Sequence, residues 1–164
     1  MRRIAALVVM ASLCAGATPA LATSVVALGA SNTYGKGVAR SEAYPAQLQA
    51  MLRAKGRSVR VVNAGINGDT TDHMLARLDG LLGRDTVAVI LQPGGNDRRR
   101  GKSDTAANIE AIRTKLSARG ITLIMMPNHM LHGLPHQPDG QHLTPEGYRG
   151  LAAAITPEVA AALH

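Results

Sequence analysis

One serine and one aspartate–histidine pair have the residue types that nucleophilic chemistry requires. Ser31 lies in the stretch GASN directly after a short apolar run, and Asp139 precedes His142 by three residues in DGQH. A carboxylate at this spacing can orient one nitrogen of an imidazole ring and leave the other facing a hydroxyl group from elsewhere in the chain. The competing interpretations are a helix-capping serine and two residues of a surface turn.

Two glycine-containing stretches offer donors for a developing negative charge. Asn96 follows two glycines in GGND, and Gly68 lies in NGDT. The side-chain amide of Asn96 and the backbone N–H groups of Gly68 and Ser31 would together form an oxyanion hole. Asn63 and Asn67 are interpreted as turn residues that bond their own backbone.

Four short apolar segments precede these stretches, and each is typical of a buried parallel strand that ends in glycine or proline. The segments are 24–29, 59–65, 86–95 and 121–127. Segments with helical periodicity alternate with them, with Gly56, Gly83 and Gly120 as predicted C-terminal caps. These helical segments are 43–56, 71–83 and 104–120, followed by 144–155 and 156–164, which both begin with Thr-Pro.

This alternation predicts an α/β fold, a three-layer α/β/α sandwich around a parallel sheet. Ligands bind beyond the carboxyl ends of the strands in such sheets. The loops that carry Ser31, Gly68, Asn96 and His142 follow four different strands. We therefore expect them to converge on one edge of the sheet.

The blocks GASN, NAGINGDTT, GGND and DGQH, in this order, resemble those of the SGNH hydrolases of the GDSL family, in particular the small periplasmic acyl-thioesterase and lysophospholipase branch. The resemblance implies a flavodoxin-like parallel sheet of four strands, with five as the alternative. It implies a catalytic triad of Ser31, His142 and Asp139. It also implies an oxyanion hole of Ser31, Gly68 and Asn96, with no cofactor and no metal.

The chain departs from the family pattern in two places. Ala30 stands where the family usually has aspartate, and residues 128–138 are too few for the helix and strand that usually precede the D-x-x-H block. The short segment predicts an open, shallow site that prefers short acyl groups. Its candidate substrate-binding residues are Tyr34, Met130, Leu131 and Leu134.

Residues 1–22 have the pattern of a signal peptide. Two arginines precede an apolar stretch, and Ala20 and Ala22 form the A-x-A ending that signal peptidase recognises. We expect residues 23–164 to be a single domain that is exported, periplasmic or secreted, without a stable membrane anchor. The only cysteine, Cys14, lies in the predicted signal peptide, so no disulfide is expected.

Composition excludes one broad class of partner. The chain has a net charge of +7, but it has no Phe or Trp and only three Tyr, so it lacks the stacking platforms of a single-strand nucleic-acid binder. We expect a small-molecule ester or thioester substrate, and the oligomeric state stays open. The basic run 98–102 is interpreted as a solvated approach to a helix, with contact to an anionic group as the alternative.

Two other functions compete with the esterase. The segment from His129 to His142 also contains His132 and His136, and imidazoles are ligands for zinc or copper. No histidine pair has the helical H-E-x-x-H arrangement, which disfavours a metal-binding protein. The other alternative is a catalytically inactive, ligand-binding relative, which Ala30 and the short segment 128–138 would favour.

Overall fold

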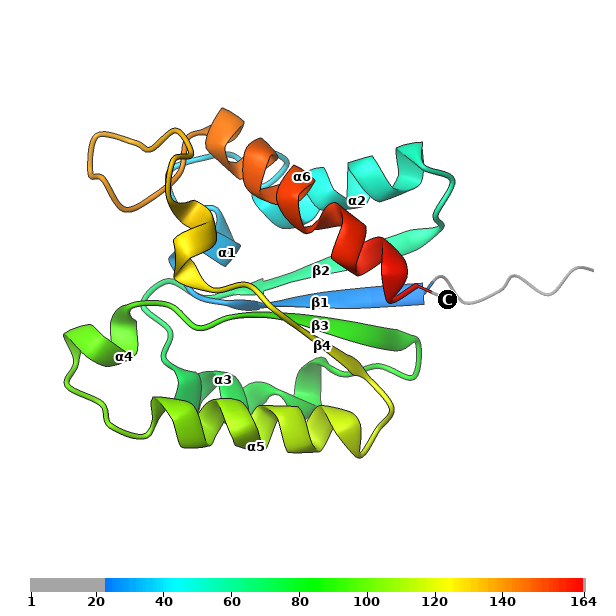
Figure 1. Ribbon diagram of the computed structural model, residues 1–164, viewed down its shortest axis with the longest axis vertical. Coiled ribbons are helices and arrows are strands. Elements are labelled where there is room, and N and C mark those ends of the chain that lie inside the picture. The colour runs from blue at the N-terminus through cyan, green and yellow to red at the C-terminus, as the bar shows by residue number, and fades with distance from the viewer. Residues whose placement is uncertain (1–22, 164) are drawn as a thin grey trace, which may run out of the picture.

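The computed structural model describes residues 23–163, and the predicted signal peptide, residues 1–22, lies outside them. A four-stranded parallel sheet forms the middle layer, in the order β2-β1-β3-β4 (Figure 1). The strands are β1 (Thr23–Gly29), β2 (Val59–Gly65), β3 (Thr86–Gln92) and β4 (Thr122–Met125). This order is that of the first four strands of a flavodoxin-like sheet, so the prediction of four strands is confirmed.

The central strand β1 is buried on both faces. Val25, Val26, Ala27 and Leu28 are all fully buried, which is the pattern of a parallel strand covered on both sides. Gly29 pairs with Gly65 of β2 and with Gln92 of β3. The three strands therefore end at the same level, and the loops that follow them start side by side.

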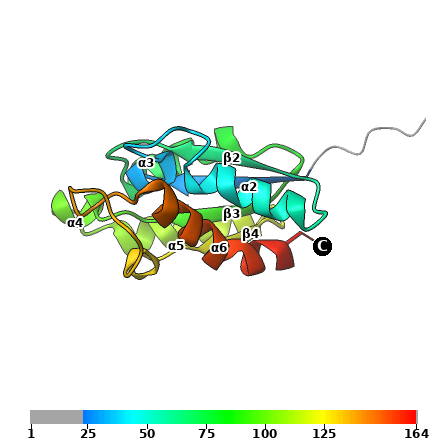
Figure 2. The same cartoon turned by 90° about the horizontal axis from the view of Figure 1, so that it is seen from above.

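Two pairs of helices cover the sheet, as Figures 1 and 2 show. Helices α2 (Tyr44–Ala54) and α6 (Pro145–Ala161) pack on one face, and α3 (Thr71–Arg77) and α5 (Thr105–Ser117) on the other. Each pair encloses its own apolar cluster with alternate residues of β1 and β3. The predicted three-layer α/β/α sandwich is confirmed.

Four short helical elements complete the described chain. Helix α1 (Ser31–Tyr34), helix α4 (Asn96–Arg99) and the 3-10 helix η2 (Asn128–Leu131) lie beyond the carboxyl ends of the strands, at the left of Figure 1. The 3-10 helix η1 (Asp79–Leu81) follows α3. The predicted convergence of loops on one edge of the sheet is therefore observed.

The predicted helix 71–83 is shorter than expected. Helix α3 ends at Arg77, and η1 follows it, where the backbone bonds tighten to three-residue turns and Gly80 weakens the helix. Gly83 is therefore not the cap of a helix, since its N–H donates to Thr86 Oγ1 at the start of β3. Gly56 and Gly120 have the positive φ of a C-terminal cap, as predicted.

The two predicted C-terminal helices form the single helix α6. Thr144 caps its start, with its hydroxyl accepting a hydrogen bond from Gly147 N at 3.2 Å. Thr156 was predicted to cap a second helix, but its hydroxyl donates to the carbonyl of Ala152 within α6. Pro157 lies inside the helix, which continues on both sides of it. The stabilisation from burying this segment therefore exceeds the cost of the hydrogen bond that proline cannot donate.

The segment before Asp139 lacks further regular layers. Between β4 and Asp139 the structure has only η2 and an isolated antiparallel bridge between His136 and Leu143. The absence of the additional helix and strand is therefore confirmed within residues 126–143. Among residues 23–163, no helix has the length and apolar character needed to cross a membrane.

Candidate active site

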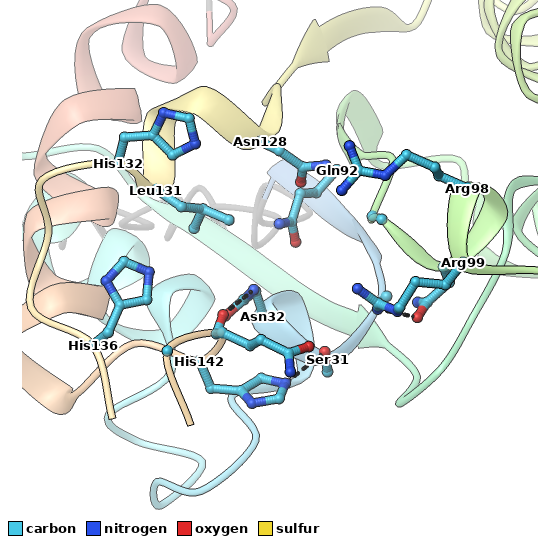
Figure 3. Close-up of a pocket in the computed structure, with 16 residues that line it drawn as sticks. Ser31, Asn32, Gln92, Arg98, Arg99, Asn128, Leu131, His132, His136 and His142 are labelled. Atoms are coloured by element: carbon cyan, nitrogen blue, oxygen red, sulfur yellow. Dashed lines mark hydrogen bonds between the residues drawn. The ribbon is translucent and has the colours of Figure 1, made fainter. Parts of the chain in front are cut away.

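The hydroxyl of Ser31 and the ring of His142 meet at the carboxyl edge of the sheet. His142 Nε2 lies 2.9 Å from Ser31 Oγ, and its Nδ1 lies 2.5 Å from Asp139 Oδ2. Figure 3 shows Ser31 and His142 together at one side of a pocket. The three residues predicted as a triad are therefore linked by two hydrogen bonds, with His142 in the middle. This geometry lets a neutral imidazole accept the serine proton.

The carboxylate of Asp139 is stabilised by several donors. Its Oδ2 bonds the His142 ring, while its Oδ1 accepts from the backbone N–H groups of His142 and Gln141 at 3.0 and 2.9 Å. The hydrogen bond from the His142 side chain, followed by those from the two backbone groups, holds the pKa of Asp139 well below its usual value. Asp139 is therefore ionised wherever the imidazole can act as a base.

The turn that carries Ser31 depends on a glycine at the end of β1. A Cβ at Gly29 would lie 2.1 Å from Thr33 Oγ1, so no other residue lets α1 fold back this closely. The Thr33 hydroxyl donates to Gln92 Oε1 at 2.9 Å, and Gln92 ends β3 while almost fully buried. This contact ties the serine turn to the neighbouring strand.

Asn32 joins the serine turn, which carries Ser31, to the histidine loop, residues 139–142, which carries His142. Its Nδ2 donates to the carbonyl of Gln141 at 3.1 Å, and its Oδ1 accepts from the hydroxyl of Tyr148 at 3.1 Å. Burial raises the pKa of Tyr148 to about 12, so this hydroxyl stays a donor. The side chain of Ala30, 4 % exposed, makes no such bond and packs into the apolar cluster between the sheet and the helices α3 and α5. The anchoring of Ser31 is therefore provided by its neighbours and not by residue 30.

The loops of Gly68 and Asn96 are bonded to each other. Asn96 Nδ2 donates to the carbonyl of Asp69 at 2.7 Å, and its Oδ1 accepts from Arg99 Nη2 at 2.5 Å. Because the amide carries two protons, one remains for the pocket that Asn96 lines. Gly68 has φ +77°, a conformation that favours glycine, and its carbonyl accepts from Arg100 Nη2 at 3.0 Å.

Two buried carboxylates hold these loops in place. Asp97, 1 % exposed, accepts from the hydroxyl and the N–H of Thr71 at 2.6 and 3.1 Å, which fixes α4 against the start of α3. Arg77 bonds Asp69 Oδ2 at 2.7 Å and the carbonyl of Ala64 at the end of β2. The predicted oxyanion residues are therefore held by packed elements on both sides.

The pocket above Ser31 has a volume of about 210 Å³ and a polar wall. Leu131 of η2 is its only large apolar side chain among the described residues. Besides Ser31, Asn96 and His142, the polar wall includes Asn32, Gln92, Arg98, Arg99, Asn128 and Gln141. His132 and His136 lie on the side opposite the arginines in Figure 3.

Three of the predicted substrate-binding residues do not line this pocket. Tyr34 is exposed, and its ring stacks with the guanidinium of Arg40, whose carbon lies 4.3 Å from the ring centre. Met130 and Leu134 pack against the apolar cluster between the sheet and α6. Leu131 belongs to the same apolar cluster and also lines the pocket, whereas Met130 packs against the cluster without lining the pocket.

The histidines of segment 129–142 do not gather around one point. Among residues 23–163, no three histidine, cysteine, aspartate or glutamate side chains lie close enough together to hold a metal ion. His136 Nδ1 bonds the carbonyl of Leu134 at 2.7 Å, and both ring nitrogens of His142 have partners. The geometry therefore gives no support to the metal-binding alternative.

Sequence reasoning missed Asn32, Gln92 and Tyr148, and it considered Arg99 only as part of the basic run 98–102. Gln92 carried a signal, since it is the polar residue at the end of the apolar segment TVAVILQ and thus directly at the predicted ligand-binding edge. Asn32 follows Ser31, and Arg99 lies three residues after Asn96. The sequence alone is equally compatible with a solvent-exposed side chain at both positions. Tyr148 lies on α6, and only the tertiary packing brings it to Asn32.

Comparison with known proteins agrees with this geometry. Residues 27–164 match the GDSL-like Lipase/Acylhydrolase family. The chain is 34% identical over 110 residues to the esterase TesA of Pseudomonas aeruginosa, which covers 65% of this chain and 55% of TesA. It is 30% identical over 116 residues to an arylesterase of Vibrio mimicus, covering 69% of this chain and 58% of the relative. The chain thus spans little more than half the length of these relatives.

A solved structure shows the same arrangement of elements. The crystal structure of TesA superposes with a TM-score of 0.77 at 25% identity, covering 86% of this chain and all of that chain. The structure of AlinE4, an SGNH-hydrolase family esterase, gives a TM-score of 0.60 at 27% identity and covers 88% of this chain and 75% of that one. The resemblance found in the four sequence blocks is therefore confirmed at the level of family and fold.

Proposed function

Because the chain belongs to the GDSL-like lipase/acylhydrolase family, we propose that it is a serine esterase that hydrolyses carboxylic ester or thioester bonds of small molecules. The observation that carries this proposal is the 2.9 Å contact between Ser31 Oγ and His142 Nε2, with Asp139 bonded to the other ring nitrogen. These linked hydrogen bonds beside a pocket favour an active enzyme over an inactive relative.

The acylation step uses the two bonds of His142. Ser31 Oγ attacks the carbonyl carbon while His142 Nε2 accepts the hydroxyl proton, and the ionised Asp139 stabilises the imidazolium that forms. The N–H groups of Ser31 and Gly68 and the free amide proton of Asn96 bind the negative oxygen of the tetrahedral intermediate. His142 then donates its proton to the leaving alcohol or thiol, which leaves the acyl group on Ser31.

Water completes the cycle by the same route. His142 removes a proton from a water molecule that attacks the acyl carbonyl, and returns it to Ser31 Oγ as the bond breaks. The pocket opens to solvent above Ser31, so water reaches the acyl group directly. The residues of this chain account for both steps without a cofactor.

The pocket supports short acyl groups as substrates. Its volume of about 210 Å³ is below the range of about 300–1,000 Å³ that is common for sites of drug-sized ligands. A long acyl chain gains affinity by burying methylenes against apolar walls, and Leu131 is the only large apolar side chain that the described residues contribute. Acetyl to butyryl groups fit this wall best.

Export is proposed from the sequence of residues 1–22, which lie outside the described residues. The charged start and the A-x-A ending at Ala22 support removal of a signal peptide and a periplasmic or secreted enzyme. The N-terminal sequence of the exported protein should begin at Thr23, and a retained Met1 would contradict this proposal.

The decisive experiment labels the nucleophile. A fluorophosphonate should modify Ser31, and Ser31→Ala should abolish both the labelling and the hydrolysis of p-nitrophenyl acetate while the circular dichroism spectrum is unchanged. Ser58→Ala is the matched control, because Ser58 is exposed at the opposite edge of the sheet, just before β2. Full activity of the Ser31→Ala variant, or loss of wild-type activity on chelation, would refute the serine mechanism.

A further inference from the structure

The pocket above Ser31 has a positively charged wall. Arg98 and Arg99 of α4 both line it, and Figure 3 shows both side chains directed toward the pocket. Among the described residues that line this pocket there is no aspartate or glutamate. A negatively charged group that enters here meets no carboxylate among the described lining residues.

The two arginines differ in their partners. Arg99 Nη2 is already bonded to Asn96 Oδ1, so part of its guanidinium orients the oxyanion donor. The guanidinium of Arg98 makes no hydrogen bond and no ion pair within residues 23–163, whereas that of its neighbour Arg100 bonds the carbonyl of Gly68. The guanidinium of Arg98 is therefore the cation of this wall that is available to a ligand.

Arg98 also borders a second, open surface pocket. A cavity of about 520 Å³ adjoins the first, and both are lined by Gly94, Gly95, Arg98 and Asn128. The other charged residues of the second cavity are engaged elsewhere: Lys102 pairs with Asp72 at 2.7 Å, and Asp97 bonds Thr71. Among the described residues, Arg98 is thus the charged side chain without a partner that borders both pockets.

From these observations we propose that Arg98 selects ester substrates that carry a carboxylate or a phosphate near the scissile bond. The inference rests on the proposed esterase function and specifies its substrate class. A guanidinium binds both anions with two parallel N–H donors, and Arg98 offers them on the rim of the pocket that contains Ser31. The surface run 98–102 therefore has a binding role through its first residue, beyond a solvated approach to a helix.

The test compares substrates that differ by one anionic group. For the acyl side, kcat/KM is measured for p-nitrophenyl butyrate and for the p-nitrophenyl monoester of succinate, which has the same number of acyl carbons. For the alcohol side, the acetyl ester of glycerol is compared with that of glycerol phosphate. The ratio of the anionic to the neutral substrate is determined for the wild type, for Arg98→Gln and for Arg98→Glu.

In at least one pair, the ratio should fall about three- to tenfold in Arg98→Gln, mainly through KM, and further in Arg98→Glu, since an exposed charge pair contributes modestly. Added salt should lower the wild-type ratio as well. Arg57→Gln is the matched control, because it removes the same charge from an exposed position before β2. It should leave both ratios unchanged, which separates Arg98 from the net charge of the protein.

The same measurements distinguish failure of the proposed esterase activity from failure of the proposed role of Arg98. If the wild type hydrolyses the neutral esters through Ser31 but both ratios are the same in Arg98→Gln, the esterase stands and the role of Arg98 is refuted. If no ester is hydrolysed, the esterase fails, and calorimetry decides the role of Arg98. Tighter binding of the succinate ester than of the butyrate ester by Ser31→Ala, lost on adding Arg98→Gln, supports it, and equal binding overturns it.

Discussion

Asp139 holds His142 at two points, the imidazole ring and the backbone. One carboxylate oxygen bonds Nδ1 at 2.5 Å, and the other accepts the backbone N–H of the same residue at 3.0 Å. The three-residue spacing in DGQH makes both contacts possible, because the turn brings the chain back over the carboxylate. Asp139 therefore fixes the position of the loop and the orientation of the ring together.

Replacing Asp139 by asparagine should separate these two roles. Asparagine keeps an oxygen that can accept from the backbone, but its amide favours the tautomer of His142 with the proton on Nε2, which cannot accept the proton of Ser31. The expected loss in kcat for p-nitrophenyl acetate is about 10³–10⁴-fold. Asp104→Asn, at an exposed position before α5, serves as the control, and a loss below tenfold in Asp139→Asn would contradict the triad.

The lowered pKa of Asp139 also predicts how its stability contribution depends on pH. The pKa of this carboxyl is lower in the folded protein than in the unfolded chain, so its stabilisation is complete above about pH 4, where an unfolded aspartate is ionised. It is lost progressively as the pH falls below 4. The Tm difference between the wild type and Asp139→Asn should therefore shrink between pH 4 and pH 3. A difference that grows over this interval would contradict this sign.

The role of Asn96 is tested by its removal. Asn96→Ala deletes one donor of the proposed oxyanion hole, so kcat should fall about 10²–10³-fold. The bonds to Asp69 and Arg99 are lost as well, and their removal should lower the free energy of unfolding by about 1–3 kcal/mol. Activity is therefore measured well below the Tm of the variant, and an unchanged kcat would exclude Asn96 from the mechanism.

The sequence predicts the layers and the Asp139–His142 pair because both follow from local patterns, whereas the family resemblance assigns Ser31 to this pair. Four buried apolar segments and the helices between them determine the sheet, and the D-x-x-H spacing brings Asp139 to His142 within one turn. Ala30 shows where this reasoning ends. Whether the serine turn is supported without an aspartate depends on Asn32, Gln141 and Tyr148, and no local pattern links residues of α1, the histidine loop and α6.

The same limit explains two of the incorrect predictions. Thr156 and Pro157 have the local pattern of a helix start, but the helix continues through them because Ile155 and Val159 are buried against the sheet. Met130 and Leu131 are equivalent in the sequence, and only the folded structure shows that Leu131 lines the pocket and Met130 does not. Tertiary packing, and not propensity, determines both outcomes.

Asp97 should couple the stability of the fold to the activity of the site. Asp97→Ala leaves the N–H of Thr71 without its partner in a buried position, which should lower the free energy of unfolding by about 1–3 kcal/mol. It also frees α4 from α3, so the donors of Asn96 and Gly68 lose their alignment and kcat falls. Thr71→Val removes the hydroxyl's bonds to Asp97 and to Asn108 Nδ2 but keeps the backbone N–H contact to Asp97, and it should have a smaller effect on both urea denaturation and kcat. Equal effects would contradict this role of the backbone contact.

The dependence on acyl chain length should reflect the single apolar side chain of the pocket. If every methylene were fully buried, kcat/KM would rise about fourfold with each one, because a buried methylene contributes about 0.8 kcal/mol. Among the described residues that line the pocket, Leu131 is the only large apolar side chain, so we expect kcat/KM for p-nitrophenyl esters to level off by about four carbons. Leu131→Ala should reduce the advantage of butyrate over acetate. Leu134→Ala removes the same atoms three residues away, outside the pocket lining, and should leave the chain-length profile as in the wild type. A steady rise to ten carbons, measured below micelle-forming concentrations, would refute the short-acyl preference, and an effect of Leu134→Ala alone would restore Leu134 as a substrate contact.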